Sequence, residues 1–514
     1  MARKTVEGDP QVVVIGAGHN GLVAATYLAR AGMKVLVVER KDHTGGAALT
    51  EAVWPGYLFS TCAHLLHGVP PKLFKDFNLS AHGVDIVPRE EPIVLTPDGS
   101  YYGPRNHESP RNHWGPDQLT AAEREQESNY LAFKSRLAGL FAPYRLGPFP
   151  SREAFLQSLS SEDQDFVEKV CRQTVREIQH ACLPSARIRG GYALDGAAVA
   201  RDPIALSLAY SSLTEPYPGE GPPQHGFVRG GMGELSNALE KEARLAGVEF
   251  VFGHRVEKIQ VEAGRTVGVR LDDGSEIAAS LILSNLDPKQ TFLRLIDESV
   301  IEPDFTARIG QLKTQVSCLK LLAVISDLPD WQSWDGDPAH PHSGSVFLNA
   351  NRESLDACYD DIAAGRPPRR PVMSVNLPSY NDRSLAQGDH QTASVWIFPA
   401  GYSLNDQSWD DCREAVAEDL VDQIDACAPN FRKSIIHYKL RTPLDIEREN
   451  AMTDGCIWHV QHNAESMFWN RPLPELRNYT SPISGLYLCG CGQHPGGEVT
   501  GIPGHNVAQL ILQG

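Results

Sequence analysis

One short segment near the start of the chain limits its possible folds most strongly: the turn Gly16-Ala-Gly18-His-Asn-Gly21. An uninterrupted β-branched run, Val12-Val-Val-Ile15, precedes it and is typical of a parallel strand buried on both faces. Apolar residues at helical spacing follow the turn as far as Gly32, and residues 34–39 form a second apolar run. Strand, turn, helix and strand in fewer than 30 residues predict one right-handed βαβ unit.

The three glycines and the end of the second strand predict a dinucleotide site. Gly16 permits the tight turn, Gly18 lets the backbone approach a pyrophosphate, and Gly21 lets helix and strand pack closely. Glu39 ends the second strand, 18 residues after Gly21, where its carboxylate would accept hydrogen bonds from an adenosine ribose. The helix N-terminus adds free N–H groups, so the predicted cofactor site also includes the neighbouring residues Ala17, His19, Asn20 and Arg40.

Two further glycine-rich segments distinguish between the dinucleotides that use such a turn. Gly45-Gly46 follows Glu39 closely, at a place where flavoproteins of the glutathione-reductase class pass near the cofactor's phosphates and ribityl chain. Residues 485–501 form a short apolar strand and a glycine-rich turn before an apolar helical pattern at 502–512. Two such anion-binding turns at opposite ends of the chain suit a long, extended dinucleotide, and therefore favour FAD over NAD.

Composition excludes nucleic acid as the main partner. The chain has 514 residues, enough for roughly two or three domains, and a formal net charge of −17. Binding to a phosphate backbone demands clustered Lys and Arg, which this composition does not favour.

Cysteine usage and hydropathy favour a reduced, cytoplasmic protein. None of the ten cysteines forms a Cys-x-x-Cys pair or a zinc-ligand spacing, so no metal site is predicted, and Cys489 and Cys491 are expected to be small buried side chains. The chain shows no signal peptide and no apolar run of 18 residues, so we expect no transmembrane segment. A peripheral membrane contact would suit a lipophilic substrate, but no basic amphipathic helix supports one.

The order of elements predicts a discontinuous domain. A Pro/Gly-rich stretch at 215–226 marks a boundary, and a helix at 233–247 follows it. Strands are expected at 248–252, 256–261 and 266–271, and after the Asp272-Asp273-Gly274 hairpin turn at 275–283. A good helical pattern recurs at 410–427, and His340-Pro-His342 is expected in a surface loop. The predicted cofactor-domain segments are 1–68, 227–295 and 456–514, and the predicted substrate-domain segments are 69–226 and 296–455.

The chain resembles the phytoene-desaturase-like FAD oxidoreductases (carotenoid desaturase and isomerase relatives), especially their pyridine nucleotide-disulphide oxidoreductase-like branch. The matching segments are residues 14–22, 45–48, 230–235, 284–288, 471–474, 485–490 and 494–497. The resemblance implies an α/β fold, with a discontinuous Rossmann-type FAD-binding domain of the glutathione-reductase and amine-oxidase type and an α+β substrate domain. The FAD contacts that it implies are Gly16, Gly18, Gly21, Glu39, Gly46, Val256 through its backbone, Gly490 and Val499, and we add Gly45, Ala47, Gly492 and Gly497 as their neighbours.

Two departures from the family pattern matter. Many relatives carry Arg on both sides of the glycine pair, whereas this chain has Thr44 and Ala47, which puts side-chain contacts to the cofactor there in doubt. Relatives also commonly have a third glycine where this chain has Glu498. We expect Glu498 to lie beside the isoalloxazine or the substrate; the alternative is a carboxylate that only stabilises the N-terminus of the last helix.

The resemblance also implies a substrate side to the flavin, built from His459 and from Met467, Phe468 and Trp469. Apolar walls with one polar tip suit a hydrophobic substrate, although an aromatic run is also typical of plain core. His64 and His67 are further candidates, and His494 is expected to be structural. Glu498, His459 and His64 are therefore the candidate catalytic residues.

The predicted function is FAD-dependent dehydrogenation of a hydrophobic small molecule, polyene-like or terpenoid-like, by hydride transfer to flavin N5, with oxygen or a quinone as electron acceptor. Gly230-Gly-Met-Gly233 does not follow an apolar strand, so no second, nicotinamide-binding domain is expected. The alternatives are amine or imine oxidation, polyene isomerisation or saturation on reduced flavin, and a partner-binding flavoprotein whose cofactor is mainly structural.

Overall fold

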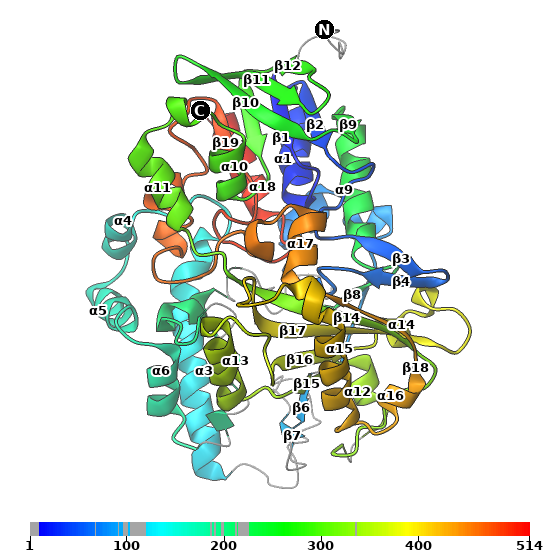
Figure 1. The fold of residues 1–514 in the computed structure, drawn as a ribbon. Coiled ribbons are helices and arrows are strands. Elements are labelled where there is room, and N and C mark those ends of the chain that lie inside the picture. Colours follow the sequence, from blue (N-terminus) through cyan, green and yellow to red (C-terminus); the bar gives the residue numbers. More distant parts are fainter. Residues whose placement is uncertain are drawn as a thin grey trace.

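The computed structural model describes residues 10–66, 68–90, 92–95, 101–102, 120–185, 188–189, 192–196, 200–210, 213, 226–334 and 337–513. The predicted boundary at 215–226 lies outside them except for Gly226, and so does His67. The described chain forms a five-stranded and a seven-stranded sheet, the first in the upper half of Figure 1 and the second below it.

The five-stranded sheet is parallel and draws its strands from three distant parts of the chain. Its order is β19-β13-β1-β2-β9. The strands are β1 (Val12–Ile15), β2 (Val35–Glu39), β9 (Glu249–Phe252), β13 (Leu281–Ser284) and β19 (Leu486–Leu488). The first predicted segment supplies β1 and β2, residues 227–295 supply β9 and β13, and residues 456–514 supply β19.

Both faces of this sheet are covered, which explains the unbroken apolar sequence of β1. Val12 and Val14 point into a core with helices α1 (His19–Arg30), α9 (Gly233–Leu245) and α18 (Ile502–Gln513). Val13 and Ile15 point into a second core with the small antiparallel sheet and two helices. Those elements are β10 (Val256–Glu262), β11 (Arg265–Leu271), β12 (Glu276–Ala278), α10 (Pro288–Arg294) and α11 (Pro303–Gln311). The predicted βαβ unit is therefore present.

The prediction of a single strand at 275–283 is wrong. The chain forms β12 in the three-stranded sheet and then β13 in the parallel sheet. Between them, the Thr266 hydroxyl donates to the carbonyl of Ser280 at 2.7 Å, and the N–H of Ala279 donates to Val267 at 3.1 Å. These bonds hold the bend that moves the chain from one sheet to the other.

The larger sheet has the order β18-β14-β17-β16-β15-β6-β7 and forms the wall opposite the cofactor domain. Its strands are β6 (Ile93–Leu95), β7 (Tyr101–Tyr102), β14 (Val316–Ile325), β15 (Ser345–Leu348), β16 (Val372–Asn376), β17 (Gln391–Gly401) and β18 (Ile435–Arg441). The predicted helix at 410–427 is α15 (Trp409–Asp425), which packs on this sheet through Leu420 and Ile424.

Helices cover the remaining side of the larger domain (Figure 1). They are α3 (Ala121–Phe141), α4 (Arg152–Gln157), α5 (Ser161–Val170) and α6 (Val175–Cys182), and they share one aromatic-rich core. The surface loop expected at 340–342 is instead a single helical turn, α12 (His340–Ser343). Pro341 is compatible with a first helical turn and is buried, which anchors this turn to the domain.

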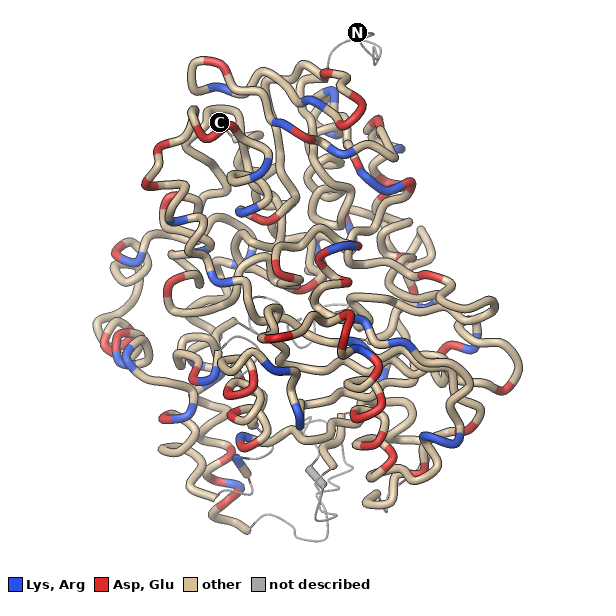
Figure 2. The backbone as a smooth tube through the Cα atoms, viewed as in Figure 1, with Lys and Arg blue, Asp and Glu red and all other residues tan. Residues whose placement is uncertain are grey.

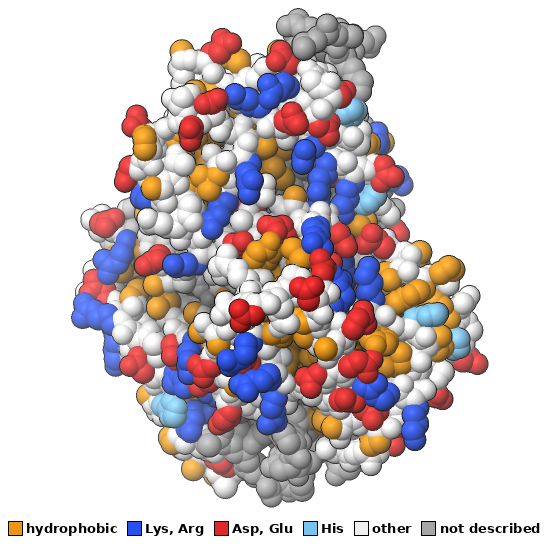
Figure 3. Space-filling view, in the orientation of Figure 1, with side chains coloured by type: hydrophobic (Ala, Val, Ile, Leu, Met, Phe, Trp, Pro, Cys, Tyr) orange, Lys and Arg blue, Asp and Glu red, His pale blue; other side chains and the backbone are white. Residues whose placement is uncertain are grey.

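Charges of both signs are interspersed over the two domains in Figure 2. A group of exposed apolar side chains lies beside histidines at the right of Figure 3. It is near the hairpin of β3 (Thr50–Trp54) and β4 (Tyr57–Ser60) and near β18. There, the ring of Trp54 stacks on His437 with centroids 5.4 Å apart. Among the described residues, no helix combines the length and apolar character that a membrane crossing requires.

Candidate active site

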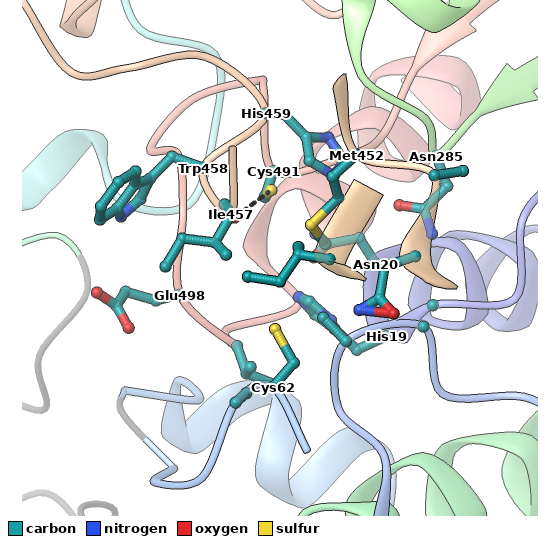
Figure 4. Close-up of a pocket in the computed structure, with 18 of the residues that line it drawn as sticks. His19, Asn20, Cys62, Asn285, Met452, Ile457, Trp458, His459, Cys491 and Glu498 are labelled. Carbon is teal, nitrogen blue, oxygen red and sulfur yellow. Dashed lines mark hydrogen bonds between the residues drawn. The ribbon is translucent and has the colours of Figure 1, made fainter. Parts of the chain in front are cut away.

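A cavity of about 1080 Å³ lies between the cofactor domain and the larger sheet and is lined by residues of both. This volume lies slightly above the usual range for small-molecule and cofactor sites, about 300–1,000 Å³. Its wall joins the N-terminal turn, the C-terminal turn and strands β14 to β17, which lie far apart in the sequence. Figure 4 shows the part of the wall where these elements meet.

The N-terminal turn is packed too closely for side chains at its glycines. A Cβ at Gly18 would lie 2.9 Å from Asn285 Nδ2, and one at Gly21 would lie 2.4 Å from the carbonyl oxygen of Gly16. Gly16, Gly18, His19 and Asn20 line the cavity, whereas Gly21 packs against the strand behind them. The close helix–strand packing predicted for Gly21 is present, and the approach of Gly18 to a pyrophosphate stays a prediction.

Glu39 connects the second strand to this turn. Its Oε2 accepts a hydrogen bond from the N–H of Ala17 at 2.8 Å, and its Oε1 accepts one from the N–H of Lys41 at 3.0 Å. Glu39 and Arg40 both line the cavity. The carboxylate therefore shapes the turn in addition to its predicted contact with a ribose, and the sequence pattern alone did not indicate this second role.

The glycine pair brings a second backbone segment beside the first. The N–H of Gly45 donates to the carbonyl of Ala17 at 3.0 Å, and a Cβ at Gly46 would lie 3.2 Å from Gly18 Cα. Gly46 and Ala47 line the cavity, and Gly45 lies behind them. Thr44 is turned away, because its hydroxyl donates to Glu240 at 2.8 Å.

At another part of the cavity, Val256 lies in the wall with Arg255, Arg270 and Arg294. Val256 pairs with Leu271 across β10 and β11, so the small antiparallel sheet positions it. This placement is consistent with the predicted backbone contact to adenine.

The C-terminal turn completes the cavity with Cys491, Glu498 and Val499. Its glycines serve mainly to allow close packing. A Cβ at Gly490 would lie 2.8 Å from the Asn285 carbonyl, one at Gly492 would lie 3.1 Å from Pro288, and one at Gly497 would lie 2.6 Å from the Tyr210 hydroxyl.

Arg471 holds this turn against the preceding segment, and the sequence did not indicate this role. Its side chain is fully buried, and its guanidinium donates hydrogen bonds to five backbone carbonyls. These are the carbonyls of Trp458, Val460, Ser466, Cys491 and Gln493, at 3.0 to 3.4 Å. The buried positive charge also contributes to the lowered pKa values of the nearby His459 and His462.

Several buried polar atoms at the junction have no partner in the described protein. Asn20 Oδ1, His19 Nε2 and His459 Nδ1 are buried without a hydrogen bond, and all three residues line the cavity. Buried polar groups are nearly always paired with protein, ligand or ordered water, so these atoms indicate a bound group with several donors and acceptors. The phosphates, ribityl hydroxyls and ring nitrogens of FAD are such groups. FAD therefore fits the residues that are present.

Glu498 is the acidic group of the junction. Its φ of 52° is uncommon for a residue other than glycine, and its carboxylate points into the cavity with no hydrogen bond from any described residue. Burial raises the pKa of Glu498 to about 7. Burial also lowers the pKa of His459 to about 3 and that of His19 to about 4, so both imidazoles are neutral at neutral pH.

The predicted substrate wall is only partly present. Met467 lines the cavity, and His64 does so too, with its Nε2 3.4 Å from Asn376 Nδ2. Phe468 and Trp469, predicted as substrate-lining, are not among the residues that line the cavity. They turn into the aromatic core of the helical side, where the Phe468 ring lies 4.6 Å from Phe141.

A buried lysine in the cavity wall was also missed. Lys320 Nζ donates to the carbonyls of Ser60 and Cys62, each at 2.6 Å. Arg441 lies opposite Lys320 in the β14–β18 register and donates to the carbonyl of Thr61. Burial lowers the pKa of Lys320 to about 7. The sequence signal that could have indicated this buried lysine is its position as the single charged residue in the apolar run 316–325.

The structure shows all ten cysteines as free thiols, with Cys489 and Cys491 buried as expected. His494 approaches the carbonyl of Tyr144 at 2.8 Å, in agreement with a structural role. No cluster of three or more His, Cys, Asp or Glu suited to a metal ion is present in the part of the chain that the structure describes.

The family model for flavin-containing amine oxidoreductases matches residues 21–504. This chain belongs to that family. It is an FAD-dependent oxidoreductase with the fold that the sequence predicted. It is 31% identical to pyridine nucleotide-disulfide oxidoreductase domain-containing protein 2 of Rattus norvegicus, over 100% of this chain and 95% of that protein.

Further similarities extend over almost the whole chain. The chain is 29% identical to one subunit of the limonene dehydrogenase of Castellaniella defragrans, over 98% of this chain and 94% of that protein. Carotenoid and phytoene desaturases are also among its relatives, so the predicted resemblance is confirmed. Cyclohexylamine oxidase of Brevibacterium oxydans shares the fold, with a TM-score of 0.61, 16% identity and coverage of 98% of this chain and 99% of that structure.

Proposed function

We propose that the protein dehydrogenates a hydrophobic small molecule, polyene-like or terpenoid-like, by removing a proton and a hydride from neighbouring carbons. The observation that carries this proposal is the Glu498 carboxylate. It lies in the C-terminal turn, faces a cavity that also has apolar walls, and has no partner among the described residues. A pKa of about 7 makes it an effective proton acceptor near neutral pH.

Bound FAD supplies the two-electron acceptor, because flavin N5 takes up hydride. The residues of the chain do the rest. The closely packed backbone at Gly18 and Gly46 would hold the cofactor in the narrow turn. Ile457, Trp458 and Met467 give the wall an apolar surface that orients a hydrophobic substrate and excludes water.

The names of two groups of relatives support this chemistry: a limonene dehydrogenase and the carotenoid desaturases. Electrons would leave the reduced enzyme to oxygen or to a quinone. Amine oxidation is the second candidate, because an amine oxidase shares the fold.

Anaerobic mixing with candidate substrates, followed through the flavin absorbance, tests the proposal. Apolar alkenes, alcohols or ketones should bleach the flavin, and Glu498→Gln should slow bleaching by about 10²- to 10⁴-fold. Glu465→Gln, at an exposed position of the preceding segment, is the matched control and should react at the wild-type rate. Bleaching by amines alone would overturn the proposal in favour of amine oxidation.

A further inference from the structure

A second polar side chain, His462, lies in the cavity wall without a partner. It is 1% exposed, neither ring nitrogen makes a hydrogen bond with the described protein, and it lines the same cavity as Glu498. Leaving a buried polar group without a hydrogen bond is energetically unfavourable. A bound molecule is therefore the expected partner of this imidazole.

The surroundings of His462 place it on the Glu498 side of the cavity. Its ring centroid lies 4.3 Å from that of Tyr210 and 6.5 Å from that of Trp458. A Cβ at Gly497, the residue before Glu498, would lie 3.3 Å from His462 Cε1.

The unpartnered groups suited to the cofactor lie elsewhere. In Figure 4, Trp458 and Glu498 lie on one side, whereas Asn20, Asn285 and His459 lie on the other. A Cβ at Gly490 would lie 3.1 Å from His459 Nδ1, which places that imidazole at the start of the C-terminal turn. His462 therefore belongs to the substrate side.

We propose that the substrate carries a carbonyl oxygen next to the C–C bond that is dehydrogenated, that His462 donates a hydrogen bond to this oxygen, and that Glu498 takes the proton from the adjacent carbon. This inference rests on the proposed function and specifies the substrate class. His462 stays neutral because burial and the nearby Arg471 lower its pKa, so one ring nitrogen carries the hydrogen that it donates.

The chemistry explains why the two side chains occur together. A carboxylate is too weak a base to take the first proton from an unactivated hydrocarbon carbon, and on a polyene it could accept a proton only as hydride leaves the neighbouring carbon. Beside a carbonyl, the negative charge moves onto oxygen, where a fixed donor in a water-poor site stabilises it. A ketone thus uses both the base and the hydrogen-bond donor of this wall, whereas a plain polyene would use the base alone.

Atoms and electrons balance in this step. The α C–H bond breaks and its proton goes to the Glu498 carboxylate. The electron pair of that bond forms the C=C double bond. The β C–H bond breaks, and its hydrogen leaves with two electrons as hydride to the flavin, so the saturated ketone becomes an enone and the flavin is reduced.

Three probes with one carbon skeleton test this inference: a 4-alkylcyclohexanone, the 4-alkylcyclohexanol and the alkylcyclohexane. In anaerobic mixing, we expect the ketone to bleach the flavin and yield the enone. The hydrocarbon should react slower by a factor on the order of 10⁴, because a site built to bond a substrate oxygen rejects an analogue that lacks it. Equal bleaching by the hydrocarbon, or oxidation of the alcohol to the ketone as the main reaction, would overturn the inference while the proposed dehydrogenation stands.

Two readouts do not depend on hydride transfer. In D₂O, the wild-type protein should exchange the α-hydrogens of the ketone, and Glu498→Gln should not. A 4-alkylphenol, which mimics an enolate, should give a long-wavelength charge-transfer band with the oxidised protein, and His462→Phe should weaken its binding at least tenfold. Binding unchanged in His462→Phe would overturn the role of His462.

His462→Phe keeps the aromatic packing, and His462→Gln provides a second variant that retains a donor. His437→Phe, at the exposed surface, is the matched control and should bind the phenol as the wild type does. The FAD content of each variant is measured by absorbance. If His462→Phe loses FAD in proportion to its loss of phenol binding, His462 is a cofactor residue and the inference is wrong. Phenol binding that depends on His462, with no bleaching by the three probes or by the apolar alkenes named above, would overturn the proposed function and retain the oxygen site.

Discussion

Glu39 accepts a hydrogen bond from the backbone N–H of Ala17 at 2.8 Å, so the end of β2 holds the turn that follows β1. The same carboxylate accepts the N–H of Lys41 through its other oxygen. One side chain thus positions two backbone segments at the predicted dinucleotide site.

Glu39→Gln should weaken FAD binding. The amide keeps one acceptor but loses the charge, and hydrogen bonds to charged groups contribute about 1.5–3 kcal/mol. We expect the Kd for FAD to rise by about one to two orders of magnitude, measured by titrating the apoprotein with FAD. Glu249→Gln, at an exposed position of β9, is the control. An unchanged Kd in Glu39→Gln would contradict this role.

Gly21→Ala should destabilise the protein, because the added Cβ would lie 2.4 Å from the Gly16 carbonyl oxygen. Overpacking of this kind costs about 1–3 kcal/mol. Gly310→Ala is the matched comparison: it lies in α11 with open space around its Cβ position and should be neutral or slightly stabilising. Denaturant unfolding of both variants measures the difference, and similar midpoints would show that the turn tolerates a side chain.

Neighbouring residues 467 and 468 should respond in opposite ways. Phe468→Ala removes a ring from the aromatic core and should lower the free energy of unfolding by about 3–5 kcal/mol. Met467→Leu conserves volume and should cost less than about 1.5 kcal/mol, yet change the affinity for substrate because Met467 lines the cavity. Substrate affinity that responds to Phe468→Ala and not to Met467→Leu would reverse this assignment.

The rate of flavin bleaching should rise with pH. Glu498 must be ionised to accept a proton, and its pKa is about 7, so the rate should increase between about pH 6 and 8 and then level off. The pKa of Lys320 in the same wall is also about 7, whereas that of His459, at about 3, keeps His459 neutral throughout. Lys320→Met should retain the rise and Glu498→Gln should abolish it, and the opposite pattern would assign the profile to Lys320.

The raised pKa of Glu498 also makes the stability of the folded protein depend on pH. Because the folded pKa of Glu498 lies above its ordinary value of 4.5, the stabilisation from its protonated form is complete below about pH 4.5 and is lost as the pH rises through 7. Compared with the wild type, Glu498→Gln should therefore gain thermal stability at pH 8 and not at pH 4. Melting curves at both values test this difference, and an equal shift at both would contradict it.

The sequence alone predicted the βαβ unit, the cofactor and the place of the C-terminal turn in the cofactor domain. Their signals are local: the apolar run at 12–15, the glycine spacing and the acidic end of β2 lie within one short stretch, where backbone geometry dictates residue type. Glu498 could also be singled out from the sequence, because it departs from an otherwise glycine-rich turn, but its role there was left between two alternatives.

Only the tertiary structure decided which other side chains face the cavity. Lys320 and Arg441 are 121 positions apart and meet through the β14–β18 register. Met467 and Phe468 are adjacent and pack in the same aromatic core, yet only Met467 also lines the cavity. The strand expected at 275–283 divides because Thr266 bonds to the Ser280 carbonyl. Pairing between distant segments determines which way these side chains point. A pattern along the chain carries no information about which distant residue a side chain will meet.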